Sequence, residues 1–274
     1  MKEYRRCVVT VVSMSLLLAA SLVKADEAAA SAPAVNTPTN APANPDVVKD
    51  WNGNIALGLS LANGNSSAFG LNAGAVLDKQ WKKDEWHFGA NGQYAVTDYG
   101  NKSNQNVTAN NFHGVVGYRH LFDERLYGLA GEEFVHDDVA DITYRFISST
   151  GVGYYFIKEP ATRLRGEAGP SWIYERVSGS DPAHHNYCAV RIAERFEHDF
   201  NKNAKIWQSL EYLPQIDAWG NYLLNAEVGV EAMLTGTLSL RAVARDQYNS
   251  QPPEGSKSND ITVIAAIVYK FGAQ

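Results

Sequence analysis

The sequence has few cysteines, no excess of basic residues and, after its first 50 residues, no long apolar run. Of its two cysteines, Cys7 belongs to the leader described next, so Cys188 remains alone and no internal disulfide is expected. Acidic residues outnumber lysine and arginine by 30 to 24, which disfavours a nucleic-acid partner. No segment after Asp50 has the length and apolarity of a transmembrane helix. These absences leave a soluble β-domain or an outer-membrane β-barrel.

The chain begins with a short basic segment, residues 1–6, followed by an uncharged apolar run over residues 7–23. Small or aliphatic residues at Val23 and Ala25 then match the two positions that a signal peptidase reads, so we predict a cleaved secretory signal over residues 1–25. The apolar run is short for a membrane anchor, which is the alternative. Cleavage would leave 20 basic and 29 acidic residues, a net charge of −9. Residues 26–50 are rich in Ala, Pro and Asn without apolar periodicity, which predicts a disordered linker.

From Trp51 onward the sequence alternates between apolar and polar residues in short segments. Each segment is close to, or somewhat longer than, the ~9–11 residues that a tilted strand needs to cross a bilayer. No segment with a helical period interrupts them. We predict twelve strands within a single barrel domain spanning residues 51–274, at 53–62, 67–79, 85–97, 107–121, 126–136, 141–156, 162–175, 186–198, 205–215, 221–233, 236–247 and 259–271.

The last predicted strand carries the clearest pattern. One of its two faces is uniformly apolar or aromatic, comprising Ile261, Val263, Ala265, Ile267, Tyr269 and Phe271. An exposed edge strand of this kind would promote aggregation of a soluble protein. In a transmembrane barrel the same strand closes the sheet against the first strand, and its aromatic end lies in the interfacial girdle.

The connections between the predicted strands alternate in length. The even-numbered ones are short, such as 82–84 and 123–125, whereas several odd-numbered ones are longer, such as 98–106, 177–186 and 249–259. Short periplasmic turns and longer external loops are typical of outer-membrane barrels, and a β-sandwich has no reason for this asymmetry. The predicted fold class is therefore all-β, a transmembrane antiparallel up-and-down β-barrel of about twelve strands in the bacterial outer membrane.

Two strands depart from the alternation. Glu132 and Glu133 are adjacent in the fifth strand, and Glu194 falls among the apolar positions of the eighth. We interpret each as a β-bulge or a position at the barrel rim.

Several short motifs occur in a characteristic order along the barrel segment. They are Trp51-x-Gly53, Gly64-Asn65-Ser66, Gly151-Val152-Gly153-Tyr154, Gly166-Glu167-Ala168-Gly169-Pro170, Glu211-Tyr212-Leu213-Pro214, Asp246-x-Tyr248, Pro252-Pro253-x-Gly255 with Asp260, and Tyr269-Lys270-Phe271. Over residues 51–271 the sequence resembles the salt-induced outer membrane protein family of Gram-negative envelopes. The resemblance implies an outer-membrane location, contact with outer-membrane lipid and lipopolysaccharide, and assembly by the barrel-assembly machinery. It implies no activity. Such chains usually end on the aromatic residue, whereas Gly272-Ala273-Gln274 follows here.

The polar face of the predicted strands is rich in charge of both signs. We predict a lumen network composed of Arg119, Arg145, Arg165, Glu167, Glu175, Arg191, Arg195, Glu211, Glu227, Glu231, Arg241 and Arg245. Paired charges would nearly close the lumen, which fits a structural or stress-responsive (salt or osmotic) envelope protein with low or gated conductance. The alternative is a porin-like channel for ions or small solutes. No cofactor is predicted.

Acidic residues also gather at the end predicted to be external. Asp137, Asp138, Asp246 and Asp260 are candidate ligands for divalent cations, which would bridge to lipopolysaccharide phosphates. A solvated loop surface is the alternative for each acid taken alone.

The same end carries the only residues that suggest an enzyme. His136 lies beside Asp137 and Asp138, and His184 beside His185, which is the composition of a hydrolytic site at the rim. No His-x-Ser arrangement suited to an outer-membrane phospholipase is present. We predict no catalytic residues and no enzymatic activity.

Overall fold

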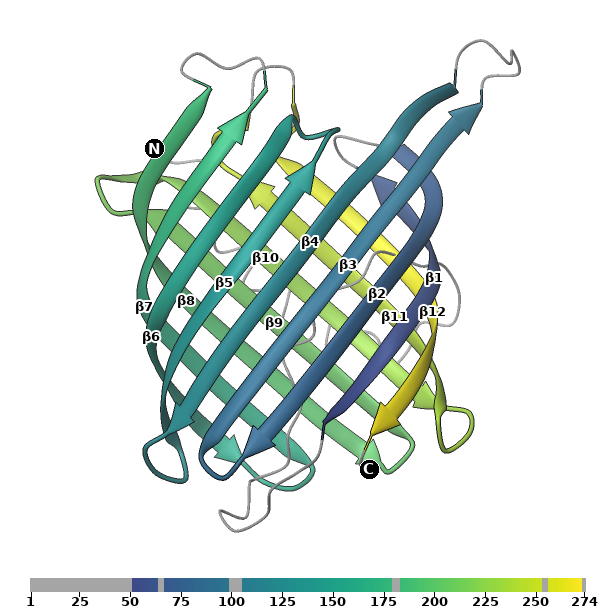
Figure 1. The fold of residues 1–274 in the computed structure, drawn as a ribbon, viewed down its shortest axis with the longest axis vertical. Coiled ribbons are helices and arrows are strands. Elements are labelled where there is room, and N and C mark those ends of the chain that lie inside the picture. The colour runs from purple at the N-terminus through teal and green to yellow at the C-terminus, as the bar shows by residue number, and fades with distance from the viewer. Residues whose placement is uncertain (1–50, 64–66, 99–104, 179–182, 253–255, 273–274) are drawn as a thin grey trace, which may run out of the picture.

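In the computed structural model, residues 51–63, 67–98, 105–178, 183–252 and 256–272 are described, and they form one closed antiparallel barrel (Figure 1). Every strand pairs with its neighbours in sequence, and the last pairs with the first. The prediction of an all-β barrel of twelve strands is confirmed. The predicted leader, residues 1–25, and linker, residues 26–50, lie outside the described residues. The strands are β1 (Asn52–Asn63), β2 (Ser67–Trp81), β3 (Asp84–Asp98), β4 (Gln105–Leu121), β5 (Leu126–Asp137), β6 (Ile142–Lys158), β7 (Thr162–Val177), β8 (His184–Asn201), β9 (Ala204–Gln215), β10 (Ala218–Met233), β11 (Leu238–Asn249) and β12 (Asn259–Gly272).

The barrel closes where β12 meets β1, as the apolar pattern of the last strand predicts. The two strands pair without a shift from Asn52 opposite Gly272 to Asn63 opposite Ile261. Gly272 has a φ of +97°, and a Cβ atom there would lie 2.2 Å from the Trp51 carbonyl oxygen, so only glycine fits this end of the seam. Closure leaves no strand edge unpaired, which a sheet surrounded by lipid requires.

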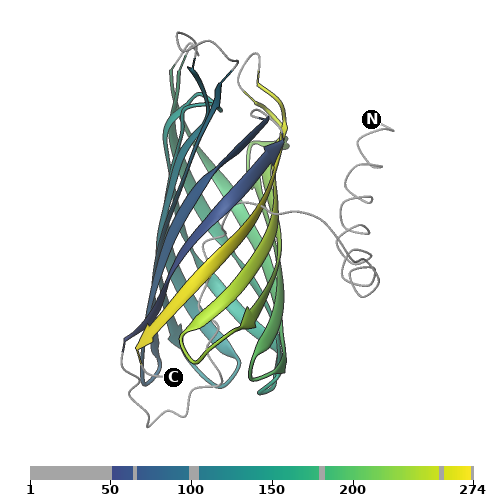
Figure 2. The ribbon, with the colours of Figure 1, turned by 90° about the vertical axis from the view of Figure 1, so that its right-hand side faces the viewer.

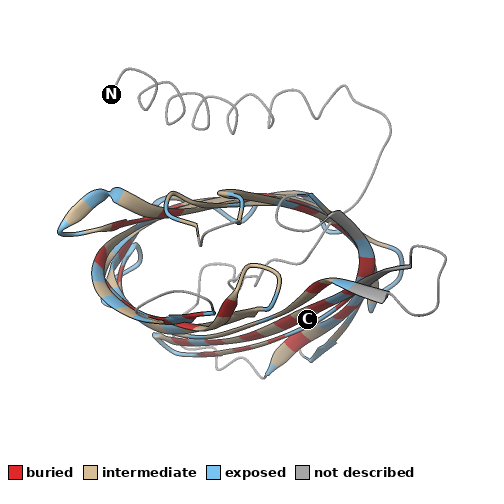
Figure 3. Ribbon diagram, turned by 90° about the horizontal axis from the view of Figure 1, so that it is seen from above, coloured by how far each residue is buried: buried red, intermediate tan, exposed pale blue. Residues whose placement is uncertain are grey.

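Alternate residues face the inside and the outside of the barrel, and Figure 3 shows buried and exposed positions alternating around the oval ring of strands. The inward direction is identified by contacts between strands that are not neighbours. Gln93 on β3 donates a hydrogen bond to Ser60 on β1 (2.8 Å), and Arg119 on β4 lies 3.4 Å from Glu167 on β7. Such contacts can be made only through the interior.

The outward face carries large exposed apolar side chains with an aromatic band near each end. One band lies near the end with the short turns and consists of Trp81, Phe122, Phe156 and Phe200. Trp172, Tyr174 and Trp219 lie toward the opposite end. Two aromatic bands flanking an apolar belt are the pattern that a membrane imposes on a barrel.

The short turns all lie at one end of the barrel, together with the start of β1 and the end of β12 (Figure 2). In the turn between β4 and β5, Asp123 accepts the backbone N–H groups of Arg125 and Leu126, each at 2.7 Å. These two hydrogen bonds lower the pKa of the Asp123 carboxyl. Local capping of this kind explains why so few residues suffice to reverse the chain.

Among the described residues, no helix is long and apolar enough to cross a membrane.

The expected bulges at Glu132–Glu133 and at Glu194 are wrong. Glu132 pairs with Val116 and Ser148, and Glu194 pairs with Gly166 and Leu210, all in continuous register within the strands. The shift in β5 comes later, between Val135 and Asp137. Glu133 therefore points inward, while Glu132 and Glu194 point outward, where Ser148 donates a hydrogen bond to Glu132 (2.6 Å) and Gln208 donates one to Glu194 (2.5 Å). A local polar partner makes an outward carboxylate tolerable without a bulge.

Candidate functional site: the barrel lumen

The most densely connected charge inside the barrel is the carboxylate of Glu167. It lies 2.8 Å from Arg191, 3.4 Å from Arg119 and 3.6 Å from Arg165. Tyr127 donates its hydroxyl to the same carboxylate at 2.7 Å. We call these five residues the Glu167 cluster. Its members come from β4, β5, β7 and β8, so one acid joins four strands through the interior.

The local sequence makes room for this cluster. Tyr127 lies flat over Gly153, where a Cβ atom would be only 2.2 Å from the phenol ring. The glycine lets the ring approach the wall and aim its hydroxyl at Glu167. The Arg119 guanidinium lies 5.6 Å from the centre of the same ring, a cation–π distance.

Further ion pairs extend from this cluster around β7 to β11. Arg191 also donates to Glu211 (2.5 Å), which accepts a bond from Asn225 (3.3 Å). Glu227 accepts the Trp207 indole N–H at 2.6 Å and lies 3.5 Å from Arg245. Trp207 and Glu227 are buried and the other four side chains are half-buried, so each pair replaces part of the lost hydration with charge-assisted hydrogen bonds.

Two smaller groups lie nearer the end with the short turns. Glu197 accepts a bond from Arg195 (2.5 Å) and lies 3.2 Å from Arg163. Glu231 lies 2.7 Å from Arg241 and 2.5 Å from Lys270, which brings β10, β11 and β12 together. Toward the opposite end, Arg145 donates to Glu175 at 2.6 Å.

The structure places all twelve residues of the predicted lumen network inside the barrel, each in at least one ion pair. We call the ion-paired part on β7 to β11 the ion-paired wall. Its residues are Arg163, Arg165, Glu167, Glu175, Arg191, Arg195, Glu197, Glu211, Glu227, Glu231, Arg241 and Arg245.

Sequence reasoning missed several residues of the network. Arg163 and Glu197 have the same parity as Arg165 and Arg195, so strand alternation alone could have identified them. Glu133, which lies 2.7 Å from His113, was obscured by its acidic neighbour. The roles of Tyr127 and Trp207 as hydrogen-bond donors have no signal in the sequence, because aromatic residues occur on both faces.

The opposite side of the lumen, on β12, β1, β2 and β3, is built differently. An apolar patch of Ala56, Ile264, Ala266 and Val268 lines the seam. Beside it, β2 and β3 present mainly amide side chains, and the imidazole of His87 is held 2.7 Å from Asp78. We call the set on β2 and β3 the amide wall. It consists of Asn72, Gln80, His87, Asn91 and Gln93.

A cavity of about 230 Å³ separates β3 to β5 from the ion-paired wall. His87, Gly117 and Gly131 line one side, and Glu167, Arg191, Glu211 and Arg245 line the other. A space of this size admits a small molecule or a few waters rather than a bulky ligand.

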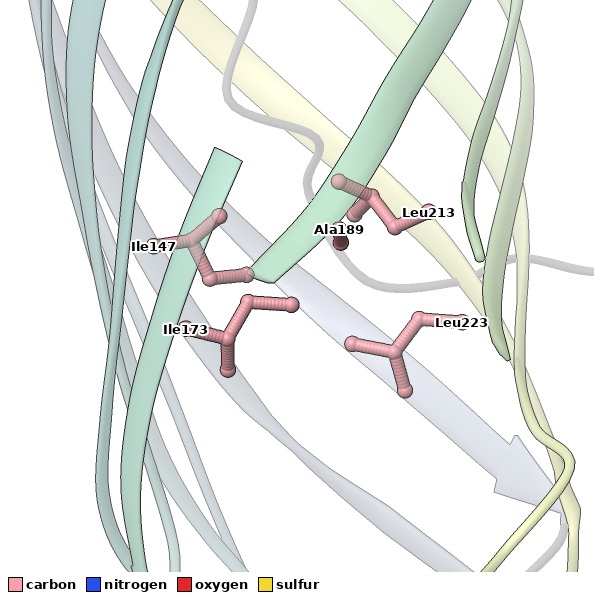
Figure 4. Close-up of a cluster of buried hydrophobic side chains, with 5 residues drawn as sticks. All are labelled: Ile147, Ile173, Ala189, Leu213 and Leu223. Atoms are coloured by element: carbon pink, nitrogen blue, oxygen red, sulfur yellow. The ribbon is translucent and has the colours of Figure 1, made fainter. Parts of the chain in front are cut away.

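A second apolar cluster narrows the lumen on β6 to β10, on the loop side of the Arg191–Glu211 pair. Figure 4 shows Ile147, Ile173, Ala189, Leu213 and Leu223 converging from these strands. Tyr187 packs against the cluster from β8. Inward-facing apolar side chains of this kind favour a packed interior over a wide aqueous pore.

The four acids proposed as candidate metal ligands lie at the loop end of the barrel, on β5, β11 and β12 and in the turn after β5. Among the described residues, no group of three or more His, Cys, Asp or Glu side chains is arranged to hold an ion. Asp137 instead accepts the backbone N–H groups of Val139 and Ala140, each at 3.0 Å, and so caps its own turn. Asp246 and Asp260 come from β11 and β12. Local turn chemistry explains Asp137 better than a metal does.

The histidines at the same end have local partners as well. His136 lies 3.3 Å from Asp138 and 2.9 Å from the Thr143 carbonyl oxygen. His184 stacks on Tyr174, with ring centres 6.2 Å apart. The two histidines are on different strands, β5 and β8, and no contact between them is recorded for the described residues.

Comparisons with known proteins agree with the barrel. A family model described as "Protein of unknown function, DUF481" matches residues 55–271. Among solved structures, a NanC porin superposes with a TM-score of 0.53 at 8% identity, covering 79% of this chain and all of its own. A KdgM porin gives 0.46 at 9% identity over 80% and 99%, and a bacterial polysaccharide outer membrane secretin gives 0.44 at 11% identity over 82% and 100%. No curated protein matches. The likeness to the NanC porin shows a shared fold.

Proposed function

We propose that this chain, which belongs to the family described as protein of unknown function, DUF481, is an integral outer-membrane barrel whose lumen is a narrow channel of low ion conductance. The proposal includes export by a signal peptide over residues 1–25 and a linker over residues 26–50. The porin-like fold and the two outward aromatic bands support the membrane location.

The observation that carries the channel proposal is the cavity between β3 to β5 and the ion-paired wall. It lies inside the barrel, and the arginines beside it are bound to carboxylates rather than lined up as a continuous cationic path. An ion that crosses must compete with several charge-assisted hydrogen bonds, so its passage is slow. Because the lumen carries side chains of both charges, neither cations nor anions meet an electrostatic potential of one sign along it.

The test is the conductance of purified protein in planar bilayers. Wild-type protein should give small currents, and Glu211→Gln or Arg241→Gln should enlarge them, because each change removes an ion pair from the lumen. Tyr154→Phe is the control, since this side chain is outward and exposed. Large, steady wild-type currents would contradict the low-conductance lumen.

A second candidate is a structural, stress-responsive role in the envelope, as the resemblance to salt-induced outer membrane proteins suggests. The Glu167 cluster favours it, because one acid joins four strands and stiffens the barrel whether or not solutes pass. Silence of the wild type and of both substitutions in bilayers, with poor growth of a deletion strain at high osmolarity, would favour this role over the channel.

We further propose that the barrel contacts outer-membrane lipid and lipopolysaccharide, and that the barrel-assembly machinery acts on its last strand. The regular outward apolar face of β12, ending in Phe271, supports this proposal. Folding into vesicles should therefore be faster when that machinery is present. An equal rate with and without it would contradict the proposal.

A further inference from the structure

Four of the nine buried polar atoms that make no hydrogen bond in the described part of the chain lie on the five residues of the amide wall. Asn72, Gln80, His87 and Asn91 are only 4%, 1%, 5% and 7% exposed. On each of them one polar atom makes no hydrogen bond: Asn72 Oδ1, Gln80 Oε1, His87 Nε2 and Asn91 Nδ2. Buried polar groups are normally satisfied, and an exception calls for a functional explanation.

The ion-paired wall gives no comparable set. Its two buried atoms that lack a hydrogen bond, Arg165 Nε and Glu231 Oε1, each face an opposite charge, at 3.6 Å from Glu167 and 2.5 Å from Lys270. Each of those charged groups is therefore already paired with an opposite charge within the protein. The groups on the amide wall have neither a hydrogen bond nor an ion pair at the atoms named.

The strand register places these atoms in a line along the barrel. From the turn end, Gln80 pairs with Glu85, Asp78 with His87, Gly74 with Asn91, and Asn72 with Gln93. Residues two apart on one face of a strand are separated by about 7 Å, so Gln80 and His87 lie one such step apart along the wall, as do Asn91 and Asn72, whereas His87 and Asn91 lie two steps apart.

Their other atoms hold these side chains in place. His87 is fixed through Nδ1 by Asp78 (2.7 Å), which leaves Nε2 for another partner. Asn72 donates from Nδ2 to the Gly92 carbonyl at 3.1 Å, which leaves its oxygen free. A binding group whose orientation is already fixed loses little entropy when it takes a ligand.

There is also space beside the wall. His87 lines the cavity of about 230 Å³, and Gly117 is its neighbour on β4. A Cβ atom added at Gly117 would meet only the His87 side chain, at 3.7 Å. The cavity therefore reaches the His87 side chain, the one residue of the amide wall that lines it.

From these observations we propose that the amide wall is the solute path of the barrel, and that it selects small uncharged polyhydroxy solutes such as polyols and sugars. The inference rests on the proposed channel function. Hydroxyl groups both donate and accept, so they suit a line that offers carbonyl oxygens, an amide N–H and an imidazole nitrogen. A charged solute would meet the ion-paired wall and have to displace its pairs, whereas an uncharged solute leaves them intact.

Liposome swelling with the folded full-length protein tests the proposal. The probes are ribitol, which is uncharged, and ribonate, a carboxylate of the same chain length. Wild-type protein should admit ribitol about tenfold faster than ribonate, because rearranging a buried ion pair costs at least the 1.4 kcal/mol that a factor of ten represents. Asn91→Leu and, separately, Asn72→Leu should each slow ribitol about fivefold, since each removes a hydrogen-bonding group from the path.

The control is Thr150→Val, which removes an outward, exposed hydroxyl at similar volume and should leave ribitol entry unchanged. Heat-modifiable gel mobility shows whether each variant has folded, and the two leucine variants give independent readings. Ribonate entering as fast as ribitol, or unchanged ribitol entry in a folded leucine variant, would overturn the solute path while leaving the channel itself intact. Entry of neither probe into wild-type liposomes, with no ion current in bilayers, would overturn the channel and the path together.

Discussion

The ion-paired wall and the amide wall face each other across one lumen, yet they solve the problem of burying polar groups in opposite ways. On β7 and β8 many inward residues are charged and satisfy one another, as Arg191 does with Glu167 and Glu211. On β2 and β3 they are mostly uncharged, and several keep an unpartnered atom. Burying a charge without a partner costs far more free energy than burying an amide without one. Unpartnered atoms that could bind a ligand are therefore tolerated only on the uncharged side.

The two walls therefore contribute differently to the stability of the barrel and to permeation. Cross-strand ion pairs connect β4, β5, β7 and β8 and resist deformation of the oval barrel. The amide wall is held by single hydrogen bonds such as Gln93 to Ser60. We expect substitutions on the ion-paired wall to affect stability most, and those on the amide wall to affect mainly permeation.

The largest effect is expected from Glu167→Gln. The change leaves Arg119, Arg165 and Arg191 without their shared carboxylate, and removing one partner of a buried ion pair costs about 3–5 kcal/mol of unfolding free energy. Urea unfolding in detergent micelles, followed by heat-modifiable gel mobility, measures the loss. The matched control is Glu85→Gln, whose carboxylate lies 3.8 Å from Arg119 and should cost about 1 kcal/mol or less. Equal losses would show that the two sides are not energetically distinct.

Two glycine-to-alanine substitutions, one beside each wall, test the comparison with an effect of intermediate size on the free energy of unfolding. Gly153→Ala would place a Cβ atom 2.2 Å from the Tyr127 ring, displacing the hydroxyl that binds Glu167, so we expect a loss of about 1–3 kcal/mol. Gly117→Ala, beside His87, meets its nearest atom at 3.7 Å and should change the unfolding free energy by less than about 0.5 kcal/mol. The same urea titration applies to both variants. A Gly117→Ala loss that matched the Gly153→Ala loss would mean that the space beside the amide wall is filled.

A smaller effect than that of Gly153→Ala is expected from Gln93→Leu on the amide wall. It removes one buried hydrogen bond of 2.8 Å to Ser60, worth about 1 kcal/mol. A double-mutant cycle with Ser60→Ala isolates the bond, and the coupling free energy should be about 0.5–1.5 kcal/mol. No coupling would mean that this wall gains nothing from the link that Gln93 and Ser60 make between β3 and β1.

The alternation of side chains along each strand is a local property, so the sequence alone determined which residues face inward. It identified twelve strands, the closing pair β1 and β12, and twelve charged residues of the lumen. The same rule would have included Arg163 and Glu197, which share parity with residues already chosen. At Glu132 and Glu133 the pattern was misread as a bulge, because an outward carboxylate with a serine donor cannot be anticipated without the neighbouring strand.

The tertiary structure decided which inward residues meet. Glu167 contacts Arg119 from a strand three places away, and that contact depends on strand tilt and on the depth of each residue in the lumen. Neither quantity can be read from side-chain alternation, because alternation specifies a face and not a height. The same holds for the amide wall: composition shows that Asn72, His87 and Asn91 are polar, and only the packed barrel shows that each keeps an unpartnered atom and that His87 lines a cavity.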